Sequence, residues 1–110
     1  MDLLATVASF TAILRPPVTE PGRTRRWSAH CLDLDMGVSA QSASAVRARL
    51  ASTIAAQIAA ESLLSRSPGR RRPATDPRLW AAARGAPVVT RQTVETDMGP
   101  VEVRYVQPAE

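Results

Sequence analysis

Cysteine, histidine and lysine are almost absent from this chain. Its 110 residues contain one cysteine, Cys31, one histidine, His30, and no lysine, so that all 14 basic residues are arginine. A single cysteine excludes a disulfide within the chain and makes a reducing cytoplasm the default compartment. His30 and Cys31 are neighbours on a predicted strand and point to its opposite faces, so they cannot converge on one metal ion. We therefore expect no disulfide, no metal and no cofactor.

Aromatic side chains are also scarce. The chain has two Trp, one Tyr and one Phe, so alanine, valine, isoleucine and leucine must supply most of the core. An N-terminal stretch, residues 3–14, is mostly apolar but follows Asp2 rather than a positive charge. It is also shorter than the roughly 20 residues that a membrane-spanning helix needs. We expect one cytoplasmic domain without a membrane segment.

In the first half of the chain, the hydrophobic period changes from that of strands to that of a helix. Residues 10–14 and 27–32 have the composition or the alternation of strands, and residues 38–41 form a third extended piece after an acidic corner. These pieces predict an antiparallel meander. Residues 46–58 then carry an apolar side chain every fourth residue, which is the period of one helical stripe. Ser42 or Ser44 can cap that helix. The predicted core is Phe10, Ala12, Trp27, Ala29, Cys31, Val46, Leu50, Ile54 and Ile58.

The second half adds a linker, a short helix and a hairpin. Residues 67–86 form an arginine- and proline-rich linker that contains a helix over residues 77–84, with Asp76 as its cap and Gly85 as its end. Residues 88–94 and 101–106 predict two strands around a turn.

This hairpin needs a surface on which to dock, because an isolated two-stranded hairpin is marginal in water. It must pack on its own sheet or on a second copy of the chain. Val101, Val103 and Tyr105 share one face of the last strand, and we expect them to close the sheet or to form an oligomer interface.

These elements predict an α+β protein. Its parts are an antiparallel three-stranded meander packed by one long helix (residues 1–66), the linker with its short helix (67–86), and the hairpin (87–110).

Residues 10–58 resemble a known family. The stretch W-S-A-H-C-L-D-L-D-M-G-V-S-A-Q-S-A-S-A-V-R-A-R-L is similar to the HicB-like antitoxin domain in the order and spacing of its aromatic, its Leu-Asp corner, its Gly-Val-Ser strand and its polar-capped helix. The resemblance implies a β-β-β-α unit related to a degenerate ribonuclease-H-like fold. It also implies a non-catalytic role, in which the domain binds and masks a small mRNA-cleaving toxin called HicA.

Full HicB antitoxins usually continue into a DNA-binding helix-turn-helix or ribbon-helix-helix. Nothing after Arg72 has that pattern, so the chain is most similar to the short, stand-alone HicB-like proteins. We expect a homodimer or homotetramer, with a HicA-like toxin as partner where one exists, or an orphan that acts as an oligomeric interaction protein.

Two other functions compete with this one. Arg66, Arg70, Arg71 and Arg72 form a basic arm that could contact phosphates of a nucleic acid, although no aromatic residue is interleaved to stack on bases. Asp33 and Asp35 could serve a small metal-dependent nuclease, but such an enzyme gathers several carboxylates around its metal ions. We expect both carboxylates to be solvated at the corner, and we expect no enzyme.

Overall fold

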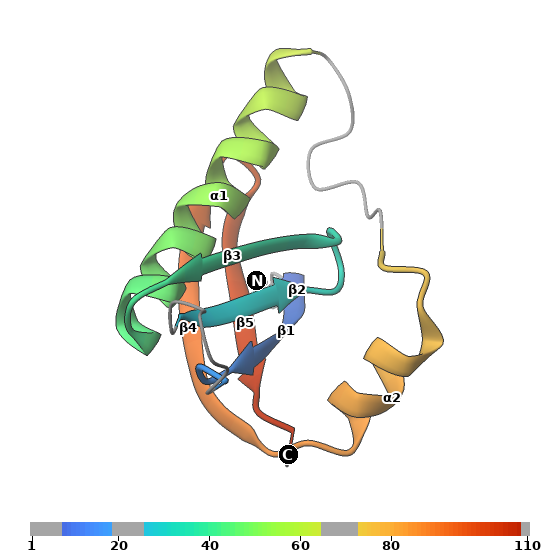
Figure 1. The fold of residues 1–110 in the computed structure, drawn as a ribbon. Helices are drawn as coiled ribbons and strands as arrows, with labels where there is room; N and C mark the ends of the chain where they lie inside the picture. Colours follow the sequence, from blue (N-terminus) through green and yellow to red (C-terminus); the bar gives the residue numbers. More distant parts are fainter. Residues whose placement is uncertain (1–7, 19–25, 65–72, 109–110) are drawn as a thin grey trace, which may run out of the picture.

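Five strands form one sheet in the computed structural model, which describes residues 8–18, 26–64 and 73–108. In chain order the elements are β1 (Ala8–Arg15), β2 (Trp27–Cys31), β3 (Met36–Ala40), α1 (Ala43–Leu63), α2 (Pro77–Arg84), β4 (Val88–Thr96) and β5 (Gly99–Val106). The strand order across the sheet is β3-β2-β1-β5-β4 (Figure 1). The predicted α+β class, with a long and a short helix, is confirmed.

The predicted meander is present as β1, β2 and β3, which pair antiparallel. Ala12 lies opposite Cys31, and Ala29 lies opposite Val38, so the small apolar residues of the three strands share one face. Residues 32–35 turn the chain between β2 and β3. Asp35 has a φ of 51° there, in the left-handed region that aspartate tolerates better than most residues.

The C-terminal hairpin docks on the chain's own sheet. Its strands β4 and β5 pair antiparallel around a turn, and β5 then runs parallel to β1, with Val103 opposite Phe10. The hairpin therefore supplies two strands of the same sheet, and the predicted three-part division does not separate it from the core.

Of the two roles expected for β5, the structure has the first, because β5 completes the chain's own sheet. Val101, Val103 and Tyr105 have an exposed fraction of 0% within a single chain, so they are core residues rather than a free interface. The parallel pairing with β1 turns their face toward α1, where they become core.

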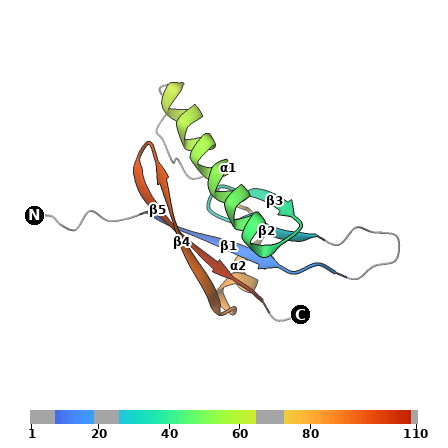
Figure 2. The same ribbon diagram turned by 90° about the vertical axis from the view of Figure 1, so that its left-hand side faces the viewer.

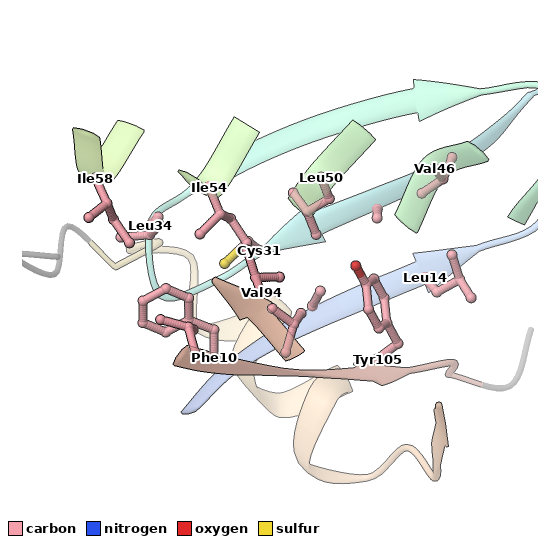
Figure 3. Packing of buried hydrophobic residues seen from close by; sticks show 14 of the residues in the cluster. Phe10, Leu14, Cys31, Leu34, Val46, Leu50, Ile54, Ile58, Val94 and Tyr105 are labelled. Carbon is pink, nitrogen blue, oxygen red and sulfur yellow. The ribbon is translucent and has the colours of Figure 1, made fainter. Parts of the chain in front are cut away.

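The main core lies between the sheet and α1 (Figure 2). Ser42 caps the helix, and its hydroxyl accepts a hydrogen bond from the amide of Ala45 at 3.1 Å. The stripe Val46, Leu50, Ile54 and Ile58 has 0% exposure and packs over Phe10, Cys31 and Tyr105 (Figure 3). Burying such a side chain contributes about 1.5–3 kcal/mol. Eight of the nine predicted core residues are buried, whereas Trp27 packs half-buried at the edge of the cluster.

A smaller helix packs on the opposite face of the sheet. α2 begins after Asp76, whose carboxylate accepts from the amide of Arg78, and ends at Gly85, as predicted. It forms a second cluster with Ile13 and Val106, which alternate with core residues along β1 and β5. In the described part of the chain, no helix is long and apolar enough to cross a membrane.

Candidate functional site

The acidic corner after β2 contains one buried and one exposed carboxylate. Asp33 is only 6% exposed, and its Oδ1 accepts a hydrogen bond from the backbone amide of Thr11 at 2.7 Å. The amide of Leu32 donates to the carbonyl of Thr11 at 2.9 Å. β2 pairs with β1 only from Ala12 onward, so Asp33 provides an acceptor for a backbone amide just past the end of that ladder. The expectation of a solvated Asp33 is therefore wrong, and the carboxylate is a structural tie between the corner and β1.

Asp35 pairs with the only histidine. Nε2 of His30 lies 2.8 Å from Oδ1 of Asp35, and both side chains are partly exposed, at 37% and 53%. Sequence reasoning found no acid partner for His30, whereas the turn with Asp35 in the left-handed region brings the two side chains together. An exposed polar contact of this kind stabilises a fold by at most about 1 kcal/mol.

Cys31 lies on the other face of β2, as the alternation predicts. It is completely buried in the main core, and this burial raises the pKa of its thiol to about 11. The thiol is therefore protonated and inaccessible at neutral pH, so it is a core residue rather than a nucleophile. Within the described residues, His, Cys, Asp and Glu side chains form no group of three that could hold a metal ion.

The clearest cavity lies between α2 and the sheet. It has a volume of about 340 Å³. Its lining comes from β1, α2, β4, β5 and the segment between α2 and β4, and consists of Thr11, Trp80, Ala83, Arg84, Ala86, Val88, Arg104 and Val106. The sequence alone could not show this cavity, because three stretches that are distant in sequence build it, around residues 11, 80–88 and 104–106. Locally, the sequence shows only that Glu102 and Arg104 alternate with the apolar residues of β5, which places the two charged residues on the other face of the strand.

The two edges of the sheet are unlike one another. At the β3 edge, the carbonyl of Ser39 accepts hydrogen bonds from Arg26 at 3.3 Å and from Arg49 at 3.0 Å. At the β4 edge, the backbone of residues 90–95 makes no hydrogen bond in the described residues beyond the ladder to β5. Val88 and Val89, at the start of β4, are 43% and 48% exposed.

The predicted basic arm cannot be placed in this arrangement. Arg66, Arg70, Arg71 and Arg72 lie outside the described residues. Comparison of the chain with protein-family models, with curated proteins and with solved structures finds no match.

Proposed function

We propose that this chain is a non-catalytic, HicB-like interaction module, which masks a small HicA-like mRNA-cleaving toxin or, as an orphan, associates with copies of itself. The observation that carries the proposal is the open β4 edge of the sheet. The order of three antiparallel strands and a helix is consistent with the unit that the resemblance implies.

An unpaired strand edge is a physical template for a partner strand, since its outward amides and carbonyls can extend the ladder. β4 has nine residues, which correspond to about 30 Å of edge at the usual rise of a strand. Val88 and Val89 add exposed apolar surface at one end. The β3 edge differs, because Arg26 and Arg49 donate hydrogen bonds to its Ser39 carbonyl.

The corner residues favour contact over catalysis. A nuclease built on Asp33 and Asp35 would need both carboxylates to face its metal ions and substrate. Asp33 instead is buried with its Oδ1 on the Thr11 amide, and Asp35 is held by His30. Both carboxylates therefore have structural partners.

The test is a pair of variants with equal charge. Val89→Lys with Thr93→Lys places two cations on the β4 edge, where they oppose a partner strand. Ala48→Lys with Ala56→Lys adds the same charge at exposed positions of α1 and serves as the control. If a short neighbouring reading frame encodes a toxin-like protein, the wild-type chain and the control suppress its RNA cleavage, whereas the edge variant does not.

The same variants test the orphan form of the proposal. Light scattering over a range of concentrations is expected to show a dimer or tetramer for wild type and control, and a monomer for the edge variant. Equal association, or equal suppression of the toxin, by all three proteins would refute a role of the β4 edge.

The nucleic-acid alternative makes a separate prediction. If residues 66–72 carry the function, replacing Arg70, Arg71 and Arg72 with Gln abolishes retention on DNA or RNA at low salt. Under the proposal made here, the substitutions leave toxin suppression and self-association unchanged.

A further inference from the structure

The cavity beneath α2 is lined by two arginines, and one of them has a buried donor without an acceptor. Arg104 extends from β5 into its lining, and the Nε of Arg104 is buried without a hydrogen-bond partner. Buried polar groups are nearly always hydrogen-bonded, so a buried donor without a partner is unusual and unfavourable. Arg84, in the last turn of α2, lines the same cavity and is exposed.

The surroundings concentrate positive charge rather than neutralise it. Arg104 lies directly opposite Arg91 of β4, and like charges in that position repel. Glu102 is two residues away on the same strand, but no hydrogen bond or ion pair joins any of these groups in the described residues. The negative end of the α2 dipole partly stabilises the charge of Arg84. Arg104 lies on a strand, where no helix dipole stabilises its charge.

Apart from Thr11, the other residues that line the cavity are apolar, and one of them, Trp80, presents a flat ring. Nε1 of Trp80 donates to the carbonyl of Ala74 at 2.7 Å, which fixes the indole ring. Ala83, Val88 and Val106 complete this side. The volume of about 340 Å³ falls within the range of small-molecule sites, which is roughly 300–1,000 Å³.

We propose that this cavity binds a small organic anion, with a carboxylate or phosphate on Arg104 and Arg84 and a flat apolar group against Trp80. Arginine donates two parallel hydrogen bonds to either oxyanion, and these bonds are stronger than those between neutral groups. The apolar wall distinguishes such a ligand from a free inorganic ion. The site adjoins the β4 edge at Val88, but it does not depend on the proposed masking of a toxin.

Three probes distinguish the sources of the oxyanion: benzoate, adenosine 5′-monophosphate and inorganic phosphate. Binding to the full chain is followed by calorimetry and by tryptophan fluorescence. Saturable binding of benzoate alone identifies a carboxylate site, and binding of the nucleotide alone identifies a phosphate site. Inorganic phosphate is expected to bind at least about tenfold more weakly, because it leaves the apolar wall in water.

Matched arginine variants complete the experiment. Arg104→Gln is expected to weaken binding by on the order of tenfold or more, because it removes a charged hydrogen bond. Arg49→Gln removes the same charge from the opposite face and is expected to leave binding unchanged. If Arg104→Gln does not fold, Arg84→Gln tests the same site at an exposed position.

Three results would overturn the proposal. One is the absence of saturable binding of both organic anions up to on the order of 10 mM. Another is equal loss of binding in Arg49→Gln and in the cavity variants. The third is phosphate binding as tight as that of the organic probes, which would leave only a non-specific basic surface.

Discussion

The two faces of the sheet use the same strands for different purposes. On the α1 face, a helix of 21 residues packs its own stripe of fully buried side chains, from Val46 to Ile58, against the sheet. On the other face, a helix of eight residues covers only part of the surface, and it encloses a cavity lined by Thr11 and Arg104. The main core therefore lies on the α1 face, whereas the α2 face has a smaller core and a cavity that contains polar side chains.

The largest effect is expected where the α1 face is broken. Ile54→Ala should lower the free energy of unfolding by about 2–5 kcal/mol, because it leaves a cavity in fully buried surroundings. Ile13→Ala, which truncates an equally buried residue under α2, should cost less, since a smaller cluster can close more easily around the lost methyl groups. Urea denaturation measures both, and a larger loss in Ile13→Ala would reverse the comparison.

The tie between the corner and β1 is expected to have the next largest effect. Asp33→Ala should destabilise the fold by about 1–3 kcal/mol, because it removes the acceptor from the Thr11 amide. Asp33→Asn keeps an acceptor oxygen and should cost less, and Asp35→Ala should cost under about 1 kcal/mol. If the three variants unfold at the same urea concentration, Asp33 is not a structural tie.

Alkaline pH should destabilise the α1 face selectively. Burial raises the pKa of Tyr105 from 10.0 to about 12 and that of Cys31 from 9.0 to about 11. Both groups bind protons more tightly when folded, so their contribution to stability is complete below the ordinary values and is lost as pH rises toward the raised ones. With no lysine in the chain, these are the only side chains expected to titrate in that range.

The measurement follows directly from this composition. Tyr105 is the only tyrosine, so phenolate absorbance reports its ionisation without overlap. The free energy of unfolding should fall with rising pH in the wild type and fall less steeply in Tyr105→Phe. Ionisation of Tyr105 near its ordinary pKa, with the chain still folded, would contradict the burial of its hydroxyl beside Gln92.

The smallest effect is expected at the start of α2. Hydrogen bonds from Arg78 lower the pKa of Asp76 below its ordinary value of 3.8. Its contribution to α2 is therefore present above that value and is lost as pH falls through the lowered one. Trp80 fluorescence should report a slight loosening of α2 in acid, and Asp76→Asn, which keeps a capping oxygen, should remove this pH dependence.

Local patterns in the sequence were sufficient for most elements. The four-residue period of the helical stripe, a serine cap at Ser42 or Ser44 and the stop at Gly85 all depend on neighbours in sequence. The stripe and the stop are found as predicted, and Ser42 is the cap of the two. Trp27 was predicted to be a core residue but is only half-buried against the core. The alternation of a strand assigns a side chain to one face of the sheet, but it does not say how much of that face the helix covers.

Long-range partners could not be predicted in the same way. Nothing local to β5 says that it pairs parallel with β1, and this pairing decides that Tyr105 is core rather than interface. The burial of Asp33 depends on a backbone amide 22 positions away, and the cavity of Arg104 depends on three stretches that are distant in sequence. Such sites are properties of the assembled sheet.

The position of β1 between β2 and β5 has a consequence for how the chain reaches its fold. β1 is made first among the described strands, yet its second neighbour is the last one to be made. Until β5 emerges from the ribosome, β1 has an unpaired edge and much of the stripe on α1 lacks its cover. Pairings between distant segments form slowly, and exposed apolar intermediates aggregate. The sheet and the cover of α1 can therefore be completed only after β5 has been made.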